Sequence, residues 1–287
     1  MTGLKKPKCL LTFASTLAFS MPVTASEEGG SSVLNAAIEN LQDGLDIIIS
    51  DDLKRAGVRI RLGAGFGFMP DYIGASDHRF RAVPLLDVRI GSRWRFSNRR
   101  LSYSAFQSDN WRLGLFLKHK SGRRESRSAV LEGLGDIDDT LQVGLFMRYR
   151  TEKMLFRAEY RHALGAGQGD SIRLTFGHGI YKSGKFSAGA VASAKWLSGR
   201  AMRTNFGVSA DQSSNSAAAL EAFVPEAGVS EVSLSLYWRY QLDDRTRLLG
   251  LAAFGRLVGD AADSPLAANN VGSANQLKLG VGFTVDF

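Results

Sequence analysis

The chain has 287 residues, a formal net charge of +8 and a single cysteine. One cysteine cannot form an intrachain disulfide or a thiolate metal site, and the basic residues are spread through apolar segments, which argues against a nucleic-acid partner. Mean hydropathy is −0.09, and beyond the N-terminus no run approaches 18 apolar residues, which excludes membrane-spanning helices.

The N-terminus has the pattern of a secretory signal. Three lysines between positions 5 and 8 precede an apolar run over 9–21, and Val23-Thr24-Ala25 supplies the small residues of a cleavage site. We expect residues 1–25 to be a signal peptide and the mature chain to begin at Ser26. A membrane anchor, the alternative, needs about 20 apolar residues, and this run is shorter.

The next segment is acidic. Residues 26–53 hold seven acids and no base, and their apolar residues recur at steps of three and four, which predicts an amphipathic helix over 31–53. We expect residues 26–55 to form a periplasmic helical leader. Residues 54–100 reverse the charge, with eleven bases and three acids. The leader is therefore expected either to dock at a basic barrel mouth or to remain mobile.

From Val58 onward, segments of about ten residues alternate apolar and polar side chains, the length and pattern of a tilted membrane strand. The last segment, 276–287, alternates without a break and ends on Phe287, as expected of a strand that pairs with the first to close a barrel. The sequence predicts an all-β, transmembrane antiparallel β-barrel of about twelve strands (10–12) over residues 56–287. The predicted strands are 58–68, 80–90, 93–105, 111–118, 141–150, 154–161, 172–181, 186–196, 203–210, 232–240, 247–257 and 276–287.

Charged residues share the polar faces of these strands, where hydrocarbon would not accept them. A barrel explains this if the polar faces turn inward to a lumen. The short links between predicted strands do not fall at one end of the barrel, which indicates that the strand count includes a missed or an added strand. The candidate lumen residues are Arg59, Arg61, Arg89, Arg148, Arg157, Glu159 and Arg161.

Signals of catalysis are weak. The four histidines match no nucleophile or zinc pattern, and His119 with Glu125 is the least unsuitable histidine–carboxylate pair. The glycines of 63–67 keep the strand alternation, so a phosphate-binding loop is not indicated, and the acidic loops show no calcium register. We therefore expect no catalytic residue, metal or cofactor.

Short motifs occupy the links between the predicted strands, and the most specific is RLVGDAADSP at 256–265, just before the terminal strand. With these motifs the chain resembles the MipA/OmpV family of outer-membrane proteins, named for the MltA-interacting protein. The motif residues are Pro70, Tyr72, Gly74, Gly122, Arg123, Glu125, Gly133, Gly135, Asp136, Gly259, Asp260, Asp263, Ser264 and Pro265, with Phe287 closing the barrel.

The resemblance implies a non-enzymatic protein of the cell outer membrane, surrounded by lipid and inserted by the barrel assembly machinery. The family's namesake is similar to an adaptor that joins a murein lytic transglycosylase to a bifunctional murein synthase. The OmpV branch is associated with adhesion, antigenicity and permeability. The first expectation is therefore a scaffold. The alternatives are a narrow pore or uptake barrel, a surface adhesin and an enzyme at the barrel rim.

Overall fold

A computed structural model describes residues 57–268 and 271–287. The predicted signal peptide and the predicted acidic leader with its helix lie outside the described residues. Among the residues that are described, no helix is long and apolar enough to cross a membrane.

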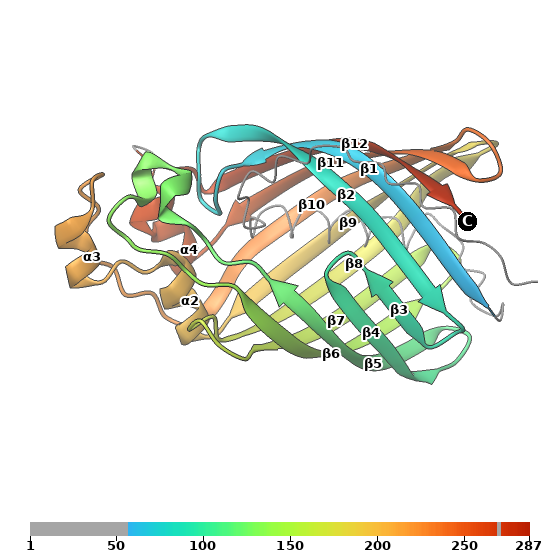
Figure 1. The fold of residues 1–287 in the computed structure, drawn as a ribbon, viewed down its shortest axis with the longest axis horizontal. Coiled ribbons are helices and arrows are strands. Elements are labelled where there is room, and N and C mark those ends of the chain that lie inside the picture. The colour runs from blue at the N-terminus through green and yellow to red at the C-terminus, as the bar shows by residue number, and fades with distance from the viewer. Residues whose placement is uncertain (1–56, 269–270) are drawn as a thin grey trace, which may run out of the picture.

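Within the described part of the chain, twelve strands form one closed antiparallel barrel in which each strand pairs with its neighbours in sequence (Figure 1). This confirms the predicted fold class. The strands are β1 (Val58–Pro70), β2 (His78–Ile90), β3 (Trp94–Ser97), β4 (Arg100–Gln107), β5 (Trp111–Lys120), β6 (Thr140–Arg150), β7 (Met154–Ala163), β8 (Asp170–Ser183), β9 (Phe186–Leu197), β10 (Gly228–Gln241), β11 (Thr246–Leu257) and β12 (Asn275–Asp286).

The seam between β1 and β12 closes the barrel. Their ladder runs from Arg61 opposite Asp286 to Phe68 opposite Leu279, and the Phe287 N–H donates to the Ile60 carbonyl at 2.8 Å. Glycine is required in this seam, because a Cβ on Gly63 would lie 2.1 Å from the Phe283 carbonyl oxygen. The glycine-rich stretch of β1 therefore serves close strand approach.

The outer face of the barrel is apolar. In β6, Leu141, Val143 and Leu145 point outward and are exposed, whereas the residues between them face the interior. Aromatic pairs lie near the strand ends: the rings of Trp111 and Tyr149 are 4.7 Å apart. A continuous apolar exterior with aromatic ends is stable in a bilayer and not in water, so the barrel is transmembrane.

The two ends of the barrel differ. The links after β2, β4, β6, β8 and β10 have two to four residues, and β1 begins and β12 ends at this end, which we call the turn end. The opposite, loop end carries the long links, with one exception at 98–99 after the short β3. The long links are 71–77, 121–139, 164–169, 198–227 and 258–274.

Two predicted strands were wrong, and the two errors cancelled in the count. The predicted strand 93–105 is the hairpin of β3 and β4, because Asn98 adopts a left-handed conformation (φ 48°) and reverses the chain. In place of the predicted strand 203–210 the chain forms helix α2 (Gly199–Phe206) and then a short extended link over 207–209. The Ser198 hydroxyl caps α2, whose buried face includes Met202 and Phe206.

Short helices occupy the loop end. They are η1 (Glu125–Arg127), η2 (Ala129–Leu131), α2 (Gly199–Phe206), α3 (Ala210–Asn215), α4 (Asp260–Asp263) and η3 (Pro265–Ala267).

An arginine on the outer face should be costly in proportion to its depth. Leu145→Arg places a charge at the middle of β6 and should lower the free energy of unfolding by about 2–4 kcal/mol, whereas Met154→Arg at the turn end should cost about 0–1 kcal/mol. Urea unfolding in phospholipid vesicles, followed by tryptophan fluorescence, measures both. Equal costs at the two positions would contradict the assigned membrane face.

Candidate functional site

The long links fold into a cap over the loop end of the barrel, which we define as residues 71–77, 121–139, 198–227, 258–268 and 271–274. The cap has two apolar clusters of its own. The distal cluster is Tyr72, Ala75, Leu131, Leu134, Val208, Leu220 and Leu266. The proximal cluster, nearer the strand ends, is Leu197, Ala201, Met202, Phe206, Leu257, Ala261 and Ala267.

Two of the sequence motifs meet in the distal cluster. The Tyr72 hydroxyl donates to the Leu266 carbonyl at 3.3 Å, and burial raises the pKa of Tyr72 to about 12. Gly74 has φ 99°, and a Cβ there would lie 3.2 Å from the same Leu266 carbonyl oxygen. In the motif 256–265, which directly precedes Leu266, the Ser264 hydroxyl donates to the Phe206 carbonyl at 2.6 Å. These motif residues therefore join three of the loops.

A third motif closes loop 121–139 on itself. The Glu125 carboxylate accepts the backbone N–H groups of Gly133 and Gly135 at 3.1 and 2.9 Å. Asp136 accepts the Glu125 N–H and the Arg124 guanidinium, both at 2.8 Å, and these bonds lower the pKa of Asp136. Both carboxylates are thus engaged with backbone.

The remaining motif residues also have structural contacts. Arg123 and Ile137 exchange two backbone hydrogen bonds, and burial lowers the pKa of Arg123 to about 10. A Cβ on Gly122 would lie 1.6 Å from the Ile137 carbonyl oxygen. Asp260 accepts the Glu226 N–H at 2.7 Å. Pro70 ends β1, Gly259 precedes α4, Asp263 ends it and Pro265 begins η3.

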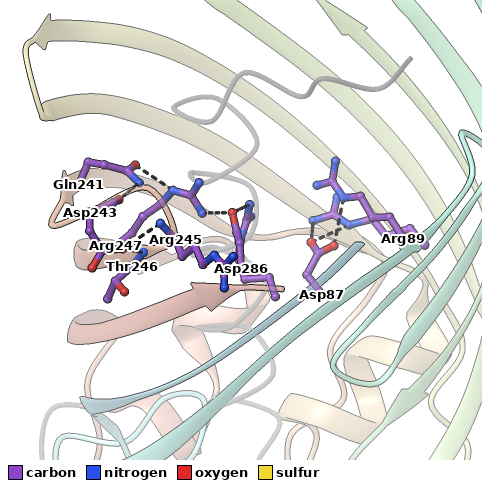
Figure 2. Close-up of polar contacts among 10 residues, drawn as sticks. Asp87, Arg89, Gln241, Asp243, Arg245, Thr246, Arg247 and Asp286 are labelled. Atoms are coloured by element: carbon purple, nitrogen blue, oxygen red, sulfur yellow. Dashed lines mark hydrogen bonds and ion pairs between the residues drawn. The ribbon is translucent and has the colours of Figure 1, made fainter. Parts of the chain in front are cut away.

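The candidate lumen residues all lie on inward-facing positions of β1, β2, β6 and β7. At the turn end two carboxylates each hold two arginines (Figure 2). Asp286 of β12 bonds Arg61 at 2.6 Å and also pairs with Arg247, which joins the closing seam to β11. Asp87 bonds Arg89 at 3.0 Å and also pairs with Arg95 of β3.

At mid-wall the interior is packed. Glu159 is 2% exposed and lies between the guanidinium groups of Arg100 and Arg161, at 2.7 and 2.6 Å. Arg100 also lies over the Phe116 ring, 3.7 Å from its centroid. An apolar cluster fills the interior faces of neighbouring strands. Its members are Leu155, Val191, Tyr237, Leu251 and Ala253.

A cavity at the turn end, which we call the arginine basin, is lined by seven arginines and, among the described residues, no acid. Guanidinium groups bind carboxylate and phosphate through paired, charge-assisted hydrogen bonds, so the basin is suited to an anionic group. The seven are Arg89, Arg93, Arg95, Arg100, Arg112, Arg148 and Arg157.

Sequence reasoning found Arg89, Arg148 and Arg157 but not the whole basin. Reading 93–105 as one strand put Arg95 and Arg100 on opposite faces, because their spacing is odd. The hairpin turn restores them to the same face, with Ser97 opposite Arg100.

The histidines form no recognisable catalytic set. His119 lies 3.1 Å from Asp139 and not against Glu125, and His162 lies 2.7 Å from Asp170. Within the described ranges no group of three or more potential metal ligands is present.

Comparison with known proteins gives a family match. The family model described as "MltA-interacting protein MipA" matches residues 62–287. No curated protein matches the sequence significantly.

Solved structures with a similar fold are barrels. They include the KdgM porin, with a TM-score of 0.40 and 9% identity over 79% of this chain and 99% of that one. Outer-membrane expressed OmpT of Vibrio cholerae has a TM-score of 0.38 and 9% identity over 84% of this chain and 100% of that one. The NanC porin has a TM-score of 0.38 and 7% identity over 80% of this chain and 99% of that one.

Removing the Glu125 carboxylate should loosen the cap. Glu125→Ala leaves the Gly133 and Gly135 N–H groups without their charged acceptor, a loss of about 1.5–3 kcal/mol per bond, or about ten- to hundredfold faster amide exchange. Hydrogen exchange with mass spectrometry measures it. The exposed neighbour provides the control, because Glu132→Ala removes a carboxylate without this role. Unchanged exchange at both glycines would contradict the assignment.

Removing Glu159 should strongly destabilise the barrel. Glu159→Ala leaves Arg100 and Arg161 without their shared buried counter-charge, which should lower the free energy of unfolding by about 3–5 kcal/mol. The matched change Glu152→Ala, in an exposed turn, should cost less than about 0.5 kcal/mol. Urea unfolding in vesicles compares the two. A cost of less than about 1 kcal/mol for Glu159→Ala would mean that water replaces the carboxylate readily.

Proposed function

Because the chain belongs to the MltA-interacting protein MipA family and forms a closed barrel of the outer membrane, we propose that it is a non-enzymatic scaffold for murein enzymes. Its partners would be a murein lytic transglycosylase and a bifunctional murein synthase. The first follows from the family's name, which denotes interaction with the transglycosylase MltA. The barrel would hold both at the inner side of the outer membrane.

The asymmetry of the barrel supports one orientation in the membrane. Outer-membrane barrels have short periplasmic turns and longer extracellular loops. The turn end of this barrel, where β1 begins and β12 ends, would therefore face the periplasm, and the cap would face outward.

The arginine basin is the observation that carries the proposal. It opens at the turn end, on the side where murein enzymes work, whereas folded loops cover the other end. The turns themselves are nearly balanced in charge, and the basin brings seven arginines together, three of which pair with Asp87 or Glu159 outside the lining. Apart from Arg93 of the basin, the exposed charges at this end are Lys153, Lys182 near the end of β8, Lys185 and Arg245 against Asp109, Glu152, Asp243 and Asp244.

A partner would then insert acidic side chains into the basin. Complementary charge of this kind favours rapid and specific association, and its contribution falls with salt. The acidic leader of residues 26–55 is a second candidate to reach the basin, since seven acids and no base lie within 26–53. Deleting 26–53 should then raise the affinity for a periplasmic partner, because a competitor is removed.

Binding to a purified MltA-type lytic transglycosylase tests the scaffold. Neutralising two basin arginines, Arg93→Gln with Arg112→Gln, should weaken binding to the detergent-solubilised chain about tenfold or more and reduce its salt dependence. Arg200→Gln, an exposed arginine of α2 in the cap, is the matched control and should bind like the unchanged chain. Equal binding by all three proteins would exclude the basin as the recognition surface. Failure of the unchanged chain to bind at all would overturn the scaffold.

A narrow anion-selective pore is the second candidate, favoured by the same arginines. The packed mid-wall around Glu159 favours the scaffold instead. In planar bilayers we expect the purified protein to pass no steady current. A steady, anion-selective current that Arg148→Gln reduces would replace the scaffold with the pore.

A further inference from the structure

The barrel wall is interrupted beside β2. β3 pairs only with residues 87–90 of β2, so residues 78–86 have a strand partner on the β1 side alone. On the other side the β4–β5 ladder ends at Arg100 opposite Lys118. We call the gap above the β3–β4 hairpin, between residues 78–86 and the end of β5 beyond Lys118, the notch. Figure 1 shows this short hairpin between the longer β2 and β5.

The floor of the notch is a specific cap on the hairpin. The Asn98 N–H donates to the Leu86 carbonyl at 2.9 Å, and the Leu86 N–H donates to the Asn98 side-chain oxygen at 2.8 Å. The backbone polar groups of Leu86 therefore point into the notch. Because these groups alternate along a strand, those of Pro84, Ala82 and Phe80 point the same way.

The edge above this floor lacks a partner among the described residues: no backbone bond reaches Phe80, Ala82 or Pro84 from the notch side. The edge also lies within the apolar belt, since Phe80 is 78% exposed and Phe66 on β1 is 66% exposed. An unpaired backbone group in hydrocarbon costs several kcal/mol and is tolerated only where water or protein meets it.

Addition of a foreign strand would satisfy such an edge, but Pro84 opposes it. Proline has no N–H to donate, and its position in the middle of the exposed edge interrupts any new ladder. The edge is therefore suited to water or to a polar headgroup, and not to a β-strand from another chain.

The surroundings of the notch are amphipathic. The outer faces of the flanking strands are apolar, with Leu117 of β5 and Phe96 of β3 exposed to the bilayer side. The inner faces of the same strands carry two buried cations, Arg81 of β2 and Lys118 of β5, and Arg99 is exposed at the floor of the notch. Acyl chains fit the outer faces, and an anionic headgroup fits the inner ones.

We propose that the notch is a lateral portal through which an anionic amphiphile, an acyl chain with a carboxylate or phosphate head, passes from the bilayer into the barrel wall. The acyl chain lies against Phe80 and Leu117. The headgroup meets Arg81, Lys118 and the N–H of Ala82, which has no backbone partner among the described residues.

Water access to the notch is the first test. In a full chain carrying Cys9→Ser, Ala82→Cys should react with a membrane-impermeant maleimide in vesicles at least about tenfold faster than Ala252→Cys. Ala252 is also an exposed outward alanine, but its strand is paired on both sides, with Leu236 and with Leu279. Equal rates at the two positions would show that hydrocarbon fills the notch and would overturn the portal.

Protection of the same cysteine tests the ligand class. Myristate and dimyristoyl phosphatidic acid, added to the vesicles separately, are the carboxylate and phosphate probes. At least one should slow labelling of Ala82→Cys about tenfold. Methyl myristate and inorganic phosphate, which lack the charge or the chain, should not. Which acid protects identifies the headgroup, and equal protection by the methyl ester would overturn the anionic preference.

Charge removal completes the test. Arg81→Gln with Lys118→Gln should abolish the protection and leave labelling itself unchanged, in protein whose fold is verified by heat-dependent gel mobility. Arg99→Gln, at the exposed floor of the notch, provides a second variant that does not disturb the interior and should weaken protection about threefold or more. Full protection in both variants would overturn the role of the cations.

Discussion

The backbone hydrogen bonds of a sheet inside hydrocarbon have to be satisfied, and the structure depends on the seam where β12 meets β1. That seam removes both open edges of a twelve-stranded sheet at once. The seam is tight enough that Gly63 and Gly65 cannot carry a Cβ without moving the facing backbone. On the inner face, the ion pairs of Asp286 with Arg61 and Arg247 join β12 to β1 and to β11. Backbone hydrogen bonds, the close approach that glycine allows and the ion pairs of Asp286 therefore all support closure of the barrel.

Once the sheet is closed, the alternation of side chains along each strand places the charged residues of the strands on the interior face. Arginines that would be excluded from lipid share the interior with Asp87, Glu159, Glu231 and Asp286. The interior is not uniform along its axis. Asp87, Glu159 and Asp286 each pair with two arginines, and the cavity at the turn end is lined by guanidinium groups whose carboxylate partners, Asp87 and Glu159, lie outside its lining. The site with the strongest preference for an anion therefore lies at the end with the shortest links.

The cap shows how long loops become ordered without strands. Its two apolar clusters bury side chains from four links, and carboxylates such as Glu125 and Asp136 hold backbone N–H groups that no ladder satisfies. The motif residues of these loops therefore build the cap. The notch is an exception to this satisfaction of backbone groups. Among the described residues, Phe80, Ala82 and Pro84 have no strand partner on the notch side, although they lie at the depth of the apolar belt.

The sequence by itself determined the fold class, the closing role of the last strand and which residues of β1, β2, β6 and β7 share the polar face. Those features follow from a period of two, which each strand carries locally. Only the tertiary structure decided that 93–105 is a hairpin and that 199–206 is a helix, because both depend on single residues, Asn98 and Ser198, whose effect is favourable only with their neighbours in place. The arginine basin, the cap and the notch depend on which segments meet across the barrel. That is set by strand register and long-range packing, which a local alternation does not encode.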